Sequence, residues 1–181
     1  MYGANMIKRI VKDVIYRHQS KCFHSSLLLY PKLSLFTLCI KGSYQMWSWL
    51  VLASIYPELF NKCKLLIRIL YRETSFNDDT YMYSNNGSKL CQMCCSYKEE
   101  TAEHVLFQCE SYNQIRQEFM VNLQAVAPPP MYEAFRFMNN KEKLCFILCA
   151  MNSNIVLEWL HVYNTLLNFV SEIYNVRKGQ V

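Results

Sequence analysis

The 181-residue chain is 52% hydrophobic and only 18% charged, so it can bury a core, and general disorder is excluded. It has four glycines and five prolines, which disfavours a turn-rich β fold and favours helices. The formal net charge is +5, and the excess of Lys and Arg lies in residues 1–73. Any surface that binds phosphates is therefore expected mainly in the N-terminal part.

Residues 1–58 are expected to form a basic, helical N-terminal region. Apolar residues recur every four positions over residues 4–18, which predicts a helix with basic side chains on its other faces. A solvated basic face is favoured there over a surface that contacts nucleic acid or membrane. The uncharged runs in residues 26–56 are shorter than the roughly 20 residues that span a bilayer, so no membrane partner is expected.

A second region, residues 59–127, is expected to hold a metal-binding module with flanking helices. Pro57 suits the first turn of the leading helix. One face of that helix is apolar, with helical spacing between Leu59, Cys63, Leu66 and Leu70. Its basic side chains, with one later arginine, are the candidate contacts to nucleic-acid phosphates: Lys62, Lys64, Arg68, Arg72 and Arg116.

The segment Phe76-Asn77-Asp78-Asp79 has the aromatic-x-Asp-Asp pattern with which polymerases hold two catalytic metal ions. Such a pair needs a buried hairpin, a third carboxylate and a surrounding sheet, whereas the flanking residues here are polar. We therefore predict a solvated loop for Asp78 and Asp79. No catalytic residue is predicted in the chain.

The segment from Cys91 to Cys109 contains a Cys-x2-Cys pair and, nine residues later, a His-x4-Cys pair. Two cysteines at the first spacing can bind one ion from a single turn, and the second spacing is usual for zinc fingers. Cys91, Cys94, His104 and Cys109 are thus predicted to hold one structural zinc ion. The expected fold is a small, mainly α-helical domain built around this Cys3His turn-helix module.

Two alternatives concern these cysteines. Disulfides would need an oxidising compartment, but the N-terminus shows no pattern of a secretory signal, so a nuclear or cytoplasmic location is expected. Cys95 could replace Cys94, which would give a Cys-x3-Cys pair. The tighter turn is more common, so Cys95 is expected to be a free thiol beside the site.

Local patterns around the ligands predict where the helices begin and end. Thr101 is a plausible N-cap, and the helix that it begins should end before Cys109, because side chains five apart lie on different faces of an α-helix. Ser111 with Gln114 has the pattern of a capping box for the next helix. The apolar face of that helix comprises Ile115, Phe119, Leu123 and Val126.

The last region, residues 131–181, is expected to consist of helices that pack on the rest of the chain. The three prolines at 128–130 are predicted to end the preceding helix and to form a stiff spacer. A short helix is expected at about 131–138, followed by a buried apolar segment at 144–150. The final helix carries an apolar stripe up to Tyr174, and Gly179 is expected to end it.

The metal-binding segment resembles the zinc-binding segment at the C-terminal end of non-LTR retrotransposon reverse transcriptases. The shared pattern is CxxC…E-T-x-x-H-x-x-x-x-C-x-x-Y, which matches Cys91, Cys94, Glu100, Thr101, His104, Cys109 and Tyr112. Arg116 falls where such segments often carry a basic residue. The resemblance covers about residues 60–118 and, more weakly, the FVSEIYNVRK stretch near the C-terminus. Cys95 departs from the pattern, since the family more often has Gly or a polar residue there.

This resemblance implies a non-catalytic nucleic-acid-binding module, a fragment or relic of such an element. Its expected partners are RNA or single-stranded DNA and the polymerase portion of a larger polyprotein. Binding should be weak and independent of sequence, because basic side chains would contact phosphates rather than base edges. The alternative is a zinc-stabilised helical domain that binds another protein through its apolar helices.

Overall fold

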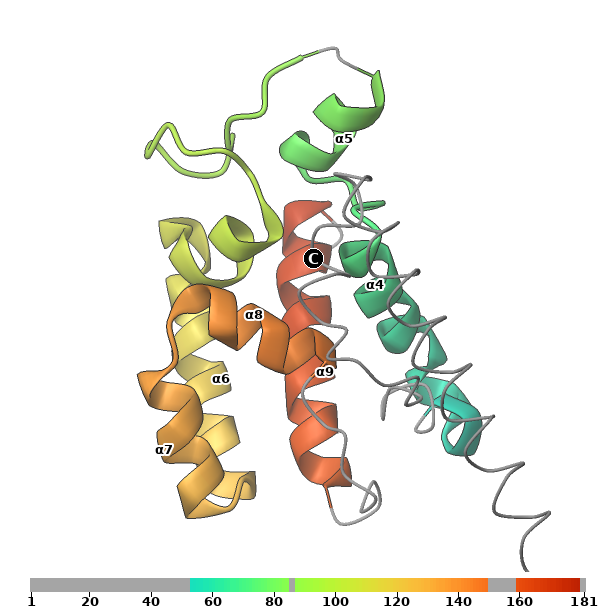
Figure 1. Ribbon diagram of the computed structural model, residues 1–181, viewed down its shortest axis with the longest axis vertical. Helices are drawn as coiled ribbons and strands as arrows, with labels where there is room; N and C mark the ends of the chain where they lie inside the picture. The colour runs from blue at the N-terminus through green and yellow to red at the C-terminus, as the bar shows by residue number, and fades with distance from the viewer. Residues whose placement is uncertain (1–52, 85–86, 150–158, 180–181) are drawn as a thin grey trace, which may run out of the picture.

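The computed structural model describes residues 53–84, 87–149 and 159–179. The mainly α-helical fold predicted from the sequence is confirmed over these ranges (Figure 1). The helix predicted at 4–18, and the 26–56 segment up to residue 52, lie outside them. The named elements are η2 (Pro57–Leu59), α4 (Phe60–Leu70), α5 (Asn77–Ser84), η3 (His104–Gln108), η4 (Glu110–Tyr112), α6 (Asn113–Val126), α7 (Pro129–Phe137), α8 (Asn140–Cys149) and α9 (Leu160–Arg177).

Helix α9 runs through the middle of the arrangement, with α4 along one side and α6 along the other (Figure 1). Most of its predicted stripe is buried, at Tyr163, Leu166, Leu167, Val170, Ile173 and Tyr174. Trp159 and Leu160, at the start of the stripe that the structure describes, are partly buried. On the α6 side, the rings of Phe169 and Phe119 stack with centroids 4.1 Å apart. Beyond the last turn, Gly179 adopts a φ of +66°, a left-handed conformation that ends a helix at low cost.

The first described helices follow the predicted pattern. Pro57 occupies the first turn of η2, where its missing N–H costs nothing. The predicted apolar face, which runs from the end of η2 along α4, is buried throughout, at Leu59, Cys63, Leu66 and Leu70. Each such side chain contributes roughly 1.5–3 kcal/mol when fully removed from water. Of the basic residues of α4, Lys64 is exposed, while Lys62 and Arg68 contact α9 at Asn168 and at the Tyr174 ring.

Two predictions about the α6–α7 region need correction. Pro129 and Pro130 are not a spacer: they form the first turn of α7, for which proline is preorganised, and Pro128 precedes it with an extended ψ of 137°. Of the predicted α6 face, Phe119 and Leu123 are buried and Ile115 is partly buried, but Val126, the last residue of the helix, is 39% exposed. The short helix expected near 131–138 is present as α7.

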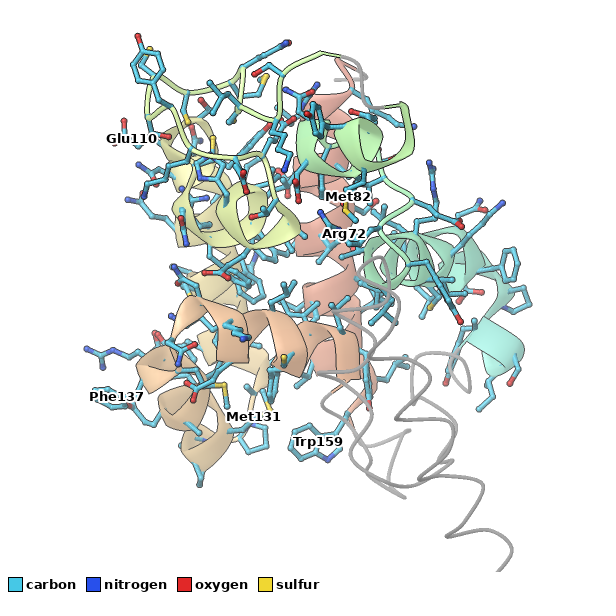
Figure 2. The ribbon with its side chains drawn as sticks, turned by 45° about the horizontal axis from the view of Figure 1, so that its top comes forward. Arg72, Met82, Glu110, Met131, Phe137 and Trp159 are labelled. Atoms are coloured by element: carbon cyan, nitrogen blue, oxygen red, sulfur yellow. The ribbon has the colours of Figure 1, made fainter. Side chains whose placement is uncertain are left out.

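The predicted solvated loop at Asp78 and Asp79 is wrong. Both residues lie in the first turn of α5 and are only 6% and 4% exposed. Arg72, labelled in Figure 2, has a φ of +55° that turns the chain between α4 and α5. Its guanidinium donates from Nε to Asp79 at 3.1 Å and from Nη2 to Asp78. The Thr74 hydroxyl also donates to Asp79. The acidic pair is thus a structural joint between two helices.

Replacing Asp79 with Ala should lower the free energy of unfolding by about 1.5–3 kcal/mol, because Arg72 and Thr74 lose a shared, buried acceptor. Glu133→Ala is the matched control, since Glu133 also faces an arginine, Arg136, but in an exposed pair 3.7 Å apart. That control should change stability by less than about 0.5 kcal/mol. Chemical denaturation measures both, and equal small losses would contradict a structural role for Asp79.

Candidate metal centre

The first two metal-ligand candidates lie in a short hairpin that backbone hydrogen bonds close at its base. The N–H of Cys91 donates to the carbonyl of Lys98 at 2.8 Å, and the N–H of Glu100 donates to that of Lys89 at 2.7 Å. The loop between them reverses through Tyr97, which has a φ of +53°. This pairing fixes the direction from which the Cys91 and Cys94 side chains enter the site.

The other two candidates are positioned by a single turn of helix, in which His104 lies and which Cys109 directly follows. Thr101 caps it as predicted, since its hydroxyl oxygen accepts the N–H of His104 at 3.1 Å. The turn at His104–Gln108 is a π-helix, and the N–H of Cys109 closes it on the His104 carbonyl at 2.7 Å. Such an i to i+5 turn brings residue i+5 back near residue i, which an α-helix would not do. Cys109 itself is extended, so the predicted helix end is confirmed.

The four ligand atoms of Cys91, Cys94, His104 and Cys109 all lie within 4.8 Å of one another. The Sγ atoms of Cys91 and Cys109 are 3.8 Å apart, and Cys94 Sγ lies 3.4 Å from His104 Nε2. A tetrahedron with metal–sulfur bonds of about 2.3 Å has edges of roughly 3.8 Å, and slightly shorter ones to a nitrogen. The cluster therefore has the size that a tetrahedral metal ion requires.

The structure also shows which of the two neighbouring cysteines, Cys94 or Cys95, lies in the cluster. Cys94 belongs to the cluster, whereas Cys95 is exposed to solvent and has its thiol free of any disulfide. The Sγ of Cys94 lies 2.9 Å from the Ser96 hydroxyl, and this hydrogen bond is the main reason why the pKa of Cys94 is lowered. The tighter Cys-x2-Cys turn is thus the one that brings its thiols together.

Burial controls the protonation of the remaining donors. It raises the pKa of the Cys109 thiol to about 12 and also raises that of Cys91, because a thiolate loses hydration inside the protein. Burial lowers the pKa of His104, which keeps its imidazole neutral and able to donate a lone pair near pH 7. Without a metal, the thiols of Cys91 and Cys109 are therefore expected to be protonated.

Neighbouring polar groups hold the two halves of the cluster together. The Arg116 guanidinium donates to the carbonyl oxygens of Cys109 and Leu106, so it braces the end of the π turn. Ser111 does not form the predicted capping box: its hydroxyl donates to the Met93 carbonyl and so ties the cysteine hairpin to the start of α6. Gln114, the other member of that box, donates instead to Glu118 at 3.1 Å.

Glu100 and Arg177 form a buried ion pair that sequence reasoning missed as part of the site. Glu100 is fully buried and lies 3.9 Å from Cys91 Sγ, while Arg177 reaches it from the last turn of α9. Glu100 is part of the CxxC…E-T-x-x-H-x-x-x-x-C-x-x-Y pattern, and this was the one sign in the sequence that it belongs to the site. No local signal links it to a residue 77 positions later.

Only some of the side chains predicted to contact phosphates are available at the surface. Arg72 is committed to Asp78 and Asp79, and Arg116 to backbone carbonyls, so neither presents its charge to solvent as predicted. The other three cations remain at the surface of α4. Lys64 is exposed, and Lys62 donates to Asn168 at 2.6 Å. Arg68 lies over the Tyr174 ring and donates to the Glu73 carbonyl. Cationic and anionic side chains balance over the described residues, so the excess of +5 resides in the rest of the chain.

Comparisons of the chain with protein-family models, with curated proteins and with solved structures each found no match. Within the described ranges, no helix combines the length and the apolar character that crossing a membrane requires. The functional interpretation therefore depends on the geometry of the cluster and on the residues around it.

Metal binding should weaken steeply as the pH falls, because the buried thiols must lose protons that they hold firmly when no metal is bound. His104, whose pKa is lowered, is already neutral and should release none near pH 7. Each released proton adds one unit of slope, so the logarithm of the apparent affinity should rise by roughly two to three per pH unit between about pH 6 and 7.5. Competition titrations with a chelating dye measure this slope, and a slope of one or less would contradict three thiolate ligands.

Proposed function

We propose that Cys91, Cys94, His104 and Cys109 hold one structural zinc ion. Three thiols and an imidazole, gathered within 4.8 Å, are the donor set that Zn²⁺ favours over harder divalent cations. Four protein ligands leave no position for water or substrate, so the ion would stabilise the fold rather than catalyse a reaction. Structural zinc contributes about 10–16 kcal/mol in isolated finger peptides, which is comparable to the stability of a whole domain.

On this zinc-stabilised frame, we propose a non-catalytic module that binds RNA or single-stranded DNA. Support comes from the family-like CxxC…H…C pattern and from the surface cations of α4, Lys62, Lys64 and Arg68. The charge excess in residues 1–52 would add further contacts to phosphates. Because the described part is neutral, such binding would be weak and would depend little on sequence. A retrotransposon origin, as fragment or relic, belongs to the same proposal.

A non-catalytic role is supported by the contacts of Asp78 and Asp79, the two carboxylates of the polymerase-like pattern. Asp78 and Asp79 face Arg72 rather than an open cavity, so their negative charge is already compensated within the protein. Two carboxylates that hold catalytic metal ions would need that charge free.

A second candidate, a protein-interaction domain, is favoured by one observation. The cysteine hairpin exposes three large apolar side chains close together in sequence, Leu90, Met93 and Tyr97, and Tyr97 is 83% exposed. The exposed Glu99 and Glu110 offset the charges of Lys98 and Lys89, which lies 3.8 Å from Glu99, so this surface has no cationic excess for a polyanion.

The zinc proposal is tested by replacing neighbouring cysteines. Wild-type protein purified under reducing conditions should contain about one zinc per chain. Cys94→Ser should reduce that content to near zero, because a hydroxyl is a poor replacement for a thiolate, whereas Cys95→Ser should leave it unchanged. Elemental analysis of all three proteins measures the content. Folded wild-type protein without zinc would overturn the proposal, and the reverse pattern in the variants would move the ligand to Cys95.

The nucleic-acid proposal is tested by a charge-matched pair of triple variants. Replacing Lys62, Lys64 and Arg68 with Ala should weaken binding to single-stranded RNA and flatten its salt dependence by roughly one unit per lost phosphate contact. The control removes the same charge from α7 and α8, at Arg136, Lys141 and Lys143, and should retain wild-type binding. Fluorescence anisotropy at several salt concentrations measures both. Identical behaviour of the two variants would favour the protein-interaction candidate.

A further inference from the structure

The Glu100 carboxylate is the place where three separate parts of the chain meet. It projects from the base of the cysteine hairpin and is fully buried. The N–H of Asn77, at the start of α5, donates to Oε2 at 2.8 Å. Arg177, in the last turn of α9, donates from Nε to Oε1 at 2.5 Å and from Nη2 to Oε2 at 3.0 Å. Such a two-point pair is both directional and strong.

The same carboxylate also lies against the metal cluster, because its Oε1 is 3.9 Å from Cys91 Sγ. Three thiolates and a neutral imidazole around a divalent cation leave one net negative charge on the centre. A second negative charge on Glu100 would oppose it in a buried environment, where charges are weakly screened. Arg177 supplies the positive charge that offsets this repulsion.

We propose that Arg177 is a positioning residue of the metal centre, which acts through Glu100 to set zinc affinity. This inference rests on the proposed zinc site. Arg177 holds the Glu100 carboxylate in one orientation and offsets its negative charge, so that this charge opposes the negatively charged metal centre less strongly. In return, the filled centre keeps the last turn of α9 and the start of α5 docked on the hairpin. Outer partners of this kind typically change metal affinity by about 10- to 100-fold.

A charge-rescue experiment separates this role from simple support of the fold. Arg177→Gln should lower zinc affinity by about tenfold or more, because Glu100 is left buried and uncompensated beside Cys91. Adding Glu100→Gln should restore most of that loss, since the double variant has no charge to compensate. If the ion pair only supported the fold, the double variant would bind zinc as weakly as Arg177→Gln, because it still lacks the pair.

The control is Lys178→Gln, which removes the same charge from the next residue. Lys178 is exposed, and its Nζ lies 4.7 Å from the centroid of the Tyr174 ring rather than at Glu100. Its replacement should change zinc affinity by less than about threefold, since exposed charges are well screened. Should Arg177→Gln fail to fold, Arg177→Lys keeps the charge and should bind zinc within about threefold of wild type. A larger loss in Arg177→Lys would contradict compensation by charge.

Zinc affinities are measured by competition with a chelator of known affinity, with circular dichroism to verify folding. Wild-type protein that binds no zinc would overturn both the zinc site and the role of Arg177. Wild-type binding with an unchanged affinity in Arg177→Gln would overturn only the role of Arg177. A double variant that binds as poorly as Arg177→Gln would do the same.

Discussion

The structure depends on bringing four donor atoms from two short segments to one point. The hairpin that carries Cys91 and Cys94 has a single bridge, between Leu90 and Glu99, and the helical turn that carries His104 is five residues long. Neither segment is long enough to be stable alone in water. Convergence of the donors, with the π turn that aligns His104 and Cys109, joins these segments into one unit. Val105 and Leu106, both fully buried, then anchor that unit in the core.

Buried ion pairs provide the second constraint, and both involve the start of α5. Arg72 connects the end of α4 to Asp78 and Asp79, while Arg177 connects the end of α9 to Glu100 and, through it, to the N–H of Asn77. Breaking either pair leaves a charge inside the protein, which costs more than the pair contributes when intact. These contacts therefore specify how the metal-binding unit sits on the helices, in addition to the apolar core.

The sequence predicted what local patterns determine. The buried faces of α4 and α9 followed from apolar residues at helical spacing, and the N-cap at Thr101 from a single hydroxyl before a helix. It also selected the four residues that cluster, because their types and spacing match a metal site. Features set by contacts that no local pattern encodes could not be predicted in this way. The burial of Asp78 and Asp79 requires Arg72 to adopt a positive φ, and the role of Glu100 requires a residue near the other end of the chain.

The prolines at 128–130 and the hydroxyl of Ser111 show a different limit. Proline can end one helix or begin the next, and a serine hydroxyl can cap a helix or bind a distant carbonyl. The choice depends on the path of the neighbouring chain. The same limit applies to the candidate phosphate contacts. Charge alone did not reveal that Arg72 and Arg116 have internal partners, so the surface that remains for a polyanion is smaller than the sequence implied.

X-ray absorption at the zinc edge of the purified protein tests the central claim most directly, because it reports the donor atoms around the ion itself. The account predicts three sulfur atoms at about 2.3 Å and one nitrogen at about 2.0–2.1 Å, with no oxygen in the first shell. A shell dominated by oxygen or nitrogen, or one with two sulfur atoms or fewer, would contradict a site made of Cys91, Cys94, His104 and Cys109.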